Sequence, residues 1–237
     1  MNFQINVSIS TKGLDTIYDS GLYVTLVKSV VSNPISGGSL PVAWVSFQPL
    51  HENQVTWQEQ FTMYATTTTL QSGATIKMTS QTDAQIQPGW IYSFERGRFT
   101  EAQGGDPGTF NLRNQQTPGN FSFGLAQPVV INNVQTSAPL NAVSVPYNVN
   151  ATFTPLEKLS LFLSSYSNNG SVIAAVASNA LNITLSSTSP QADVGFNDQT
   201  NTFYLKKAGL RSSKDFVGSL AAAQVAGEGG RSGLHVA

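Results

Sequence analysis

Apolar and polar residues alternate along much of this chain, which is the pattern of strands rather than helices. At the N-terminus, Phe3, Ile5, Val7 and Ile9 are separated by single polar residues. Successive side chains of a strand point to opposite faces, so these four share one face. The pattern predicts a half-buried strand at the start of the chain.

The next two apolar stretches predict strands of a different kind. Residues 22–31 read LYVTLVKSVV, apolar at both parities, which is typical of a strand covered on both faces. Residues 42–47 are predicted as the following strand. It ends before Pro49, because a proline cannot continue a strand in the middle of a sheet. Residues 11–21 carry two glycines and two aspartates and are predicted as a loop.

Residues 40–80 form the stretch around which we expect the fold to be organised, since they hold two of the three tryptophans. Residues 54–65 are predicted as one strand, with Glu59 on its apolar face. A buried lone carboxylate is costly. Glu59 therefore turns to solvent at a bulge, pairs with an arginine, or is a ligand-facing acid in a pocket.

The remaining pattern completes an all-β protein, an antiparallel β-sandwich of roughly a dozen short strands. Gly and Pro separate these segments, and an Asn-Asn-Gly turn at residues 168–170 predicts a hairpin. The further predicted strands are residues 73–80, 90–99, 109–113, 121–125, 129–131, 140–145, 149–153, 159–163, 172–177, 181–185 and 202–205.

A repeated motif bears on domain organisation. Phe-x-Pro-Leu occurs at residues 47–50 and 153–156, each time before an acid and an alternating strand. The two interpretations are a pair of related β units in tandem, residues 1–114 and 115–207, or one merged sandwich domain of residues 1–207.

The C-terminal residues 208–237 change to Gly, Ala and Ser, and they predict a flexible tail with a short helix over residues 214–226. The N-terminus has neither a basic nor an apolar leader segment, and no run reaches 18 apolar residues. We therefore expect no transmembrane segment, and a protein that is cytoplasmic or exported without a recognisable leader.

Composition excludes several function classes. Charged residues make up 11% of the chain, against roughly 25% in a typical globular protein, and the net charge is −1. A chain without a basic face is a poor partner for nucleic acid. There is no cysteine, which removes disulfides, thiolate nucleophiles and cysteine-based metal sites.

The sequence contains little that could perform catalysis. His51 and His235 are the two histidines, and no Gly-x-Ser-x-Gly motif accompanies them. Glu59 and Glu95 are the carboxylates that could act as a hydrolase pair if the fold brought them together. We expect a protein that is not an enzyme and that holds no metal or cofactor.

The candidate ligand-binding residues are Trp90, Tyr92, Arg96 and Arg98, where the densest aromatic cluster meets the densest charge cluster. Aromatic faces beside arginine hold sugars and lipid headgroups by stacking and bidentate hydrogen bonds. The structural alternative is that the arginines only neutralise nearby carboxylates. The predicted function is non-enzymatic recognition of glycans or membrane surfaces, in the manner of lectins or cytolysins. The alternative is a structural protein that self-assembles into a homo-oligomer through strand edges or its C-terminal tail.

Overall fold

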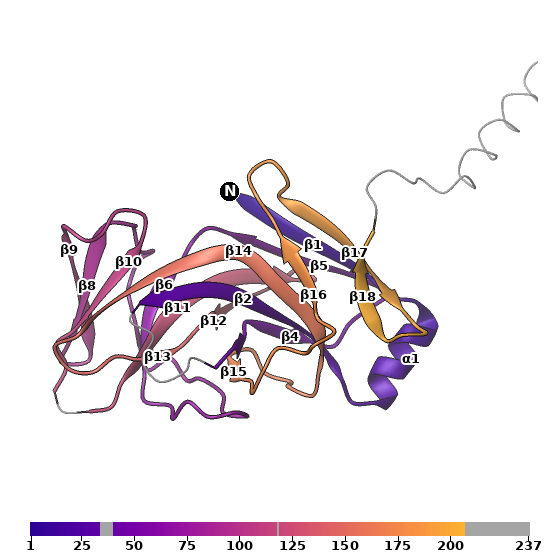
Figure 1. Ribbon diagram of the computed structural model, residues 1–237, viewed down its shortest axis with the longest axis horizontal. Helices are drawn as coiled ribbons and strands as arrows, with labels where there is room; N and C mark the ends of the chain where they lie inside the picture. Colours follow the sequence, from indigo (N-terminus) through magenta and orange to yellow (C-terminus); the bar gives the residue numbers. More distant parts are fainter. Residues whose placement is uncertain (34–39, 118, 207–237) are drawn as a thin grey trace, which may run out of the picture. The chain divides into compact units, whose positions relative to one another are not determined.

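The computed structural model describes residues 1–33, 40–117 and 119–206, and residues 1–206 form one compact unit. The predicted flexible tail and its short helix, residues 208–237, lie outside the described residues. Among these described residues, two large sheets pack against each other, and one helix lies beside β17 (Gln191–Asn197) and β18 (Thr202–Leu205) (Figure 1).

The first sheet, sheet A, contains nine strands drawn from the whole length of the chain. In spatial order it runs β18 (Thr202–Leu205), β17 (Gln191–Asn197), β1 (Asn2–Ser8), β5 (Glu52–Gln58), β11 (Ser122–Ile131), β6 (Thr62–Thr66) and β7 (Ser80–Gln81). Two further strands, β12 (Val134–Pro139) and β13 (Val143–Ser144), also pair with β11.

The second sheet, sheet B, contains seven strands. Its order is β4 (Val45–Phe47), β2 (Tyr23–Asn33), β14 (Asn150–Ser164), β10 (Phe110–Asn114), β8 (Trp90–Glu95) and β9 (Arg98–Gln103), and β16 (Leu181–Thr184) joins β14. A small third sheet pairs β3 (Val42–Ala43) with β15 (Ser171–Val172).

The predicted all-β sandwich is confirmed, with a mixed strand order. Most pairs are antiparallel, but β1 runs parallel to β17 and β10 runs parallel to β8. Each of the three sheets takes strands both from residues 1–114 and from residues 119–206.

The main core lies between sheets A and B, where the alternating apolar positions meet. Phe3, Ile5 and Val7 of β1 are at most 2% exposed, as their spacing predicts. Trp44 and Trp57 meet edge to face at 5.3 Å between ring centroids, which joins the segment 42–47 to β5. The tryptophan-rich stretch of the sequence is therefore part of the centre of the core.

The loop prediction for residues 11–21 is wrong, because helix α1 occupies Thr11–Asp19. Ser10 begins the helix, since its hydroxyl accepts a hydrogen bond from the backbone N–H of Gly13. Leu14 and Ile17, three residues apart, bury the inner face of the helix. The two glycines and two aspartates favour a turn. The Ser10 N-cap and the helical spacing of Leu14 and Ile17 stabilise a helix more strongly.

Several predicted strand boundaries are also wrong. The segment 54–65 breaks after Gln58 and resumes at Thr62, so it forms β5 and β6. Residues 149–153 and 159–163 join into the single 15-residue strand β14. In the segment 73–80 only Ser80 belongs to a strand, β7, with Thr75 in an isolated bridge to Ser171.

Candidate functional site

Each large sheet has an irregularity in its hydrogen-bond ladder. In sheet A, Ala126 pairs with Thr62, and Val129 pairs with Trp57. Between these pairs, the two residues 127 and 128 of β11 face the four residues 58–61. In sheet B, Pro155 pairs with Val30 and Leu159 with Lys28, so the three residues 156–158 face one residue. Such bulges change the direction in which side chains point.

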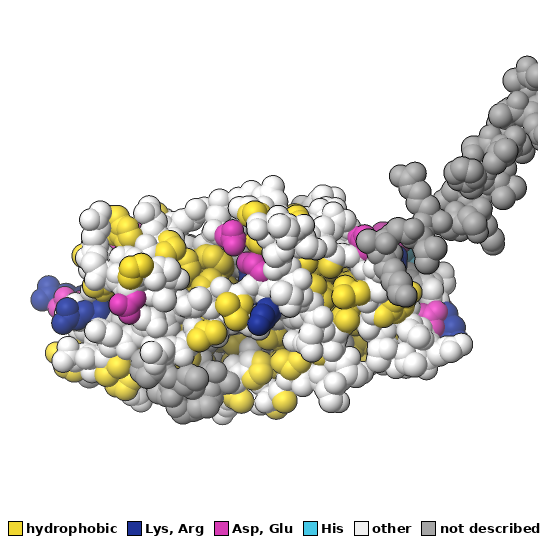
Figure 2. Space-filling model, turned by 45° about the horizontal axis from the view of Figure 1, so that its top comes forward, with side chains coloured by type: hydrophobic (Ala, Val, Ile, Leu, Met, Phe, Trp, Pro, Cys, Tyr) yellow, Lys and Arg dark blue, Asp and Glu magenta, His cyan; other side chains and the backbone are white. Residues whose placement is uncertain are grey.

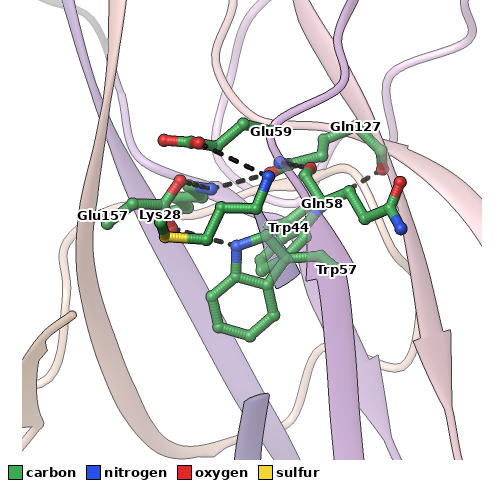
Figure 3. Close-up of polar contacts among 8 residues, drawn as sticks. Lys28, Trp44, Trp57, Gln58, Glu59, Gln127 and Glu157 are labelled. Carbon is green, nitrogen blue, oxygen red and sulfur yellow. Dashed lines mark hydrogen bonds and ion pairs between the residues drawn. The ribbon is translucent and has the colours of Figure 1, made fainter. Parts of the chain in front are cut away.

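The side chains that these bulges redirect meet between the sheets in a group that we call the lysine cluster: Lys28, Trp44, Trp57, Phe61, Gln127 and Glu157. Lys28 Nζ donates to Glu157 Oε1 at 2.7 Å and to Gln127 Oε1 at 2.9 Å. Lys28 and Gln127 are 1% and 0% exposed. Figure 3 shows the three side chains converging from different strands.

Neighbouring groups fix the orientation of both lysine partners. Trp57 Nε1 donates to Glu157 Oε2 at 3.0 Å. Gln127 Nε2 donates to the Gln58 carbonyl at 2.6 Å, which leaves Gln127 Oε1 facing the lysine. The ammonium also lies 5.3–5.6 Å from the ring centroids of Trp44, Trp57 and Phe61, within the range of cation–π attraction.

Burial dominates the electrostatics of this cluster. Loss of water around Lys28 lowers its pKa from 10.5 to about 8, even though the Glu157 carboxylate favours the charged form. Chemically, the cluster holds a carboxylate and a carboxamide around one amine nitrogen, which loses its proton more readily than a lysine in water.

The outer face of sheet A carries a second feature, a groove of about 520 Å³. We call it the amide groove, because seven of its lining residues carry amide or hydroxyl side chains and none of its described lining residues is charged. Those seven are Asn2, Gln4, Thr56, Gln58, Gln60, Gln135 and Gln191.

Strand register arranges the middle of the groove as one row across five strands. Gln191 pairs with Gln4, Gln4 with Thr56, Thr56 with Val130, and Val130 with Gln135. Neighbouring strands lie about 4.8 Å apart, so the row spans about 19 Å. Four of the five positions in this row offer side-chain hydrogen-bond donors or acceptors to an extended ligand, and Val130 is the apolar position between Thr56 and Gln135.

Hydrogen bonds continue the amide array on the neighbouring row. Gln4 Nε2 donates to Asn6 Oδ1 at 2.8 Å, and Asn6 Nδ2 donates to Asp193 Oδ1 at 2.8 Å. The hydrogen bonds from Asn6 and Gln191 hold the pKa of Asp193 below its usual value. The side chains beside the groove are thereby held in place before any ligand arrives.

One aromatic ring lies on the same outer face. Tyr204 of β18 pairs with Gly195 of β17, and a Cβ built on Gly195 would lie 2.4 Å from Tyr204 Cζ. The ring therefore covers the glycine, and Tyr204 remains 48% exposed. Gly195 pairs with Ser8. This pair lies four residues along the strands from the Gln4–Gln191 pair, so the two pairs are about 13 Å apart.

The four predicted ligand residues do not share one surface. Tyr92 is 2% exposed, and its hydroxyl accepts from the backbone N–H of Gln87. Trp90, on the same parity of β8, packs against the core and is half-buried.

Arg96 and Arg98 lie instead at the tip of the β8–β9 hairpin. Arg96 and Gly97 make the turn with positive φ, and Glu95 pairs with Arg98. Figure 2 shows Lys and Arg side chains at the end of the molecule that carries this hairpin. Arg96 Nε lies 4.0 Å from Glu95 Oε1, and both side chains of this weak contact are exposed.

The candidate catalytic residues also lie apart from one another. Glu59 follows β5 of sheet A and is turned toward solvent, with its side chain 51% exposed, while Glu95 ends β8 of sheet B. His51 Nδ1 lies 3.1 Å from the Ile9 carbonyl. In the part of the chain that the structure describes, no three His, Asp or Glu side chains come together as a metal site requires.

Sequence reasoning missed the lysine cluster and the amide groove. Lys28 interrupts an apolar run, which is the signal of a buried charge, but its partners come from bulges 99 and 129 residues further along the chain. The groove had a simpler signal, namely the outward polar positions of β1 and β5, whose neighbours in space only the sheet order reveals.

The fold and its surface thus define an all-β sandwich with an uncharged polar groove on one outer face. No family model matches the chain, and the searches of curated proteins and solved structures found no match either. Among the described residues no helix is long and apolar enough to cross a membrane.

Proposed function

We propose that this protein is a non-enzymatic recognition protein that binds uncharged glycans through the amide groove. The observation that carries the proposal is the row of amide and hydroxyl side chains, Gln191, Gln4, Thr56 and Gln135, across a groove without charged lining. Sugar hydroxyls both donate and accept, and each carboxamide offers both kinds of partner.

Tyr204 adds the aromatic contact that sugar recognition commonly uses. Its exposed ring lies against the outer face of β17, on the same side of sheet A as the amide groove. A sugar that stacks on this ring and extends along the face would reach the Gln4–Gln191 pair. The proposal therefore places the ligand on sheet A and away from the arginines of the β8–β9 hairpin.

A screen of the full chain on neutral and acidic glycans, with vesicles of zwitterionic and anionic lipid, tests this function. We expect binding to neutral glycans that changes little with salt, because a neutral sugar carries no charge whose attraction salt could screen. Binding to the vesicles alone would favour the membrane alternative and contradict the glycan proposal.

Two matched variants locate the site. Thr56→Arg places a long cation in the middle of the groove and should weaken glycan binding by about tenfold or more, that is about 1.4 kcal/mol. Thr100→Arg adds the same charge at an exposed position of β9 in sheet B, away from the amide groove and Tyr204, and should leave binding unchanged. Equal affinity in the two variants would contradict the placement of the site.

Self-assembly is the second candidate, and β9 is the feature that favours it. Among the described strands β9 pairs with β8 alone, and nearly all its residues are exposed. An open edge of this kind can pair with another chain, although Arg98 and Glu101 on the edge oppose this. Sedimentation of the protein at micromolar concentration tests it, because a monomer contradicts self-assembly and a defined oligomer supports it.

A further inference from the structure

The lysine cluster brings together three groups that can react with one another. Lys28 Nζ lies 2.9 Å from the carboxamide oxygen of Gln127 and 2.7 Å from Glu157 Oε1. Lys28 belongs to β2 of sheet B and Gln127 to β11 of sheet A, so the contact joins the two layers. The carboxamide oxygen accepts from a second N–H of the ammonium, and this hydrogen bond holds the acyl group of Gln127 against the same nitrogen that contacts the carboxylate.

We propose that Lys28 and Gln127 form an intramolecular isopeptide bond between Nζ and Cδ, with release of ammonia. The bond would connect the two sheets covalently in a chain that contains no cysteine. This modification does not rest on the proposed glycan-binding function: Lys28, Gln127 and Glu157 are not among the residues that line the amide groove, although Trp57 and Gln58 border both sites.

The reaction balances without any additional reagent. Glu157 takes a proton from the Lys28 ammonium, and the electron pair freed on Nζ forms a bond to Cδ of Gln127. The Cδ–Nε2 bond then breaks as Glu157 returns that proton to Nε2, which leaves as ammonia. Nζ gives its surplus proton to Glu157 and becomes an amide nitrogen, and the ammonia carries the last proton into solvent as ammonium.

The surroundings favour each of these steps. Burial lowers the pKa of Lys28 to about 8, so a larger fraction of the amine is neutral and nucleophilic near neutral pH than for a lysine in water. The fold holds amine and carboxamide in contact, which replaces a bimolecular encounter by an effectively unimolecular step.

The carboxylate is equally well placed for its role. Trp57 Nε1 fixes Glu157 Oε2 and leaves Oε1 on the lysine, within reach for proton transfer. The Glu157 side chain is 13% exposed, so the cluster borders solvent on this side and ammonia can leave. The aromatic rings of Trp44 and Phe61 exclude water that would otherwise compete with the amine.

Mass spectrometry of the unmodified full-length protein tests the proposal without any variant. We expect the intact mass to fall short of the sequence mass by one ammonia. A protease digest should contain a branched peptide that joins the segments around Lys28 and Gln127. Loss of ammonia at Asn169-Gly170 by succinimide formation would give the same intact mass but no branched peptide, and that result would overturn the proposal, as would a full sequence mass.

Two variants then test the assigned roles. Glu157→Gln removes the proton acceptor, keeps the shape of the side chain, and should retain the ammonia. Gln127→Glu should close the same bond with loss of water, which gives a product of the same mass as the linked wild-type protein. The matched control Gln135→Glu, in the amide groove, should still lose the ammonia at Gln127 and should not lose water. Ammonia loss from Glu157→Gln at the wild-type rate would contradict the role of Glu157.

Discussion

At the scale of single residues, the ammonium of Lys28 loses its contacts with water when the chain folds. It then contacts one carboxylate, one carboxamide and three aromatic rings. Desolvation is the largest effect, and it lowers the pKa of this lysine in the folded state. The unfolded chain therefore binds more protons than the folded protein between about pH 8 and pH 10.5.

This difference predicts a pH dependence that reports on the covalent bond. In the variant Gln127→Met, which has no carboxamide to react, stability should be lowest below about pH 8 and should rise by about 2 kcal/mol toward pH 10. Above pH 10 the raised pKa values of Tyr64 and Tyr92 act in the opposite direction. Urea unfolding at a series of pH values measures the rise.

The linked wild-type protein provides the comparison. Its Lys28 nitrogen is an amide and does not titrate, so its stability should show no rise between pH 8 and pH 10. The same rise in both proteins would show that the wild-type lysine is free.

Gly195 is a second residue with a testable consequence. Gly195→Ala places a Cβ where the Tyr204 ring lies, and this half-exposed ring should move rather than the backbone. We expect a stability change below about 1 kcal/mol in thermal unfolding and a loss of glycan affinity of the same order as in Tyr204→Ala. Unchanged affinity in both variants would remove Tyr204 from the site.

At the scale of elements, helix α1 shows packing outweighing intrinsic propensity. Gly13 is buried inside the helix, and a Cβ there would lie 2.7–2.9 Å from Asp198, Phe196 and Ile9. Alanine is the better helix former by about 1 kcal/mol. The glycine remains because α1 approaches β17 and the following turn closely.

We therefore predict that Gly13→Ala destabilises the protein by about 1–3 kcal/mol, despite the gain in helix propensity. The contact atoms include core side chains that cannot simply rotate into solvent. Lys12→Ala, at the exposed neighbouring position, is the control and should stay within about 0.5 kcal/mol of the wild type in urea unfolding. A stabilised Gly13→Ala variant would contradict the close approach.

At the scale of the whole molecule, residues 1–206 contain every described core cluster. Lys206, the last described residue, donates its backbone N–H to the Asp193 carbonyl beside the β17–β18 pair and its Nζ to Ser8 Oγ of β1. The described core is thus built from residues 1–206.

This organisation predicts that a chain ending at Lys206 unfolds at the same temperature as the full chain, within about 2 °C. The measurement is calorimetric unfolding of both chains under the same conditions. A chain ending at Ser189 is the control, because it lacks β17, the parallel partner of β1, and β18, which pairs with β17, and it should not fold cooperatively. A large drop in unfolding temperature for the Lys206 chain would show that the C-terminal residues support the core.

Most of the fold class could be predicted from the sequence, because alternation fixes which face of each strand is buried. Phe3, Ile5 and Val7 illustrate this, since their spacing alone places them in the core. Strand neighbours could not be predicted, because the bulges near Glu157 and Gln127 depend on contacts distant in sequence. The candidate site was predicted at Trp90 and Tyr92 because local aromatic density cannot distinguish a core strand from a binding surface.

The parallel pairing of β1 with β17 has a consequence for biosynthesis. The hydrogen bonds between β1 and β17 cannot form until Gln191, the partner of Gln4, has left the ribosome. At roughly 5–20 residues per second the delay lasts on the order of 10–40 s, during which one edge of the first strand stays open to other nascent chains. Such a long-range closure also belongs to the slow-folding class of topologies, so production of this protein should benefit from slow synthesis at low temperature or from a chaperone that shields strand edges.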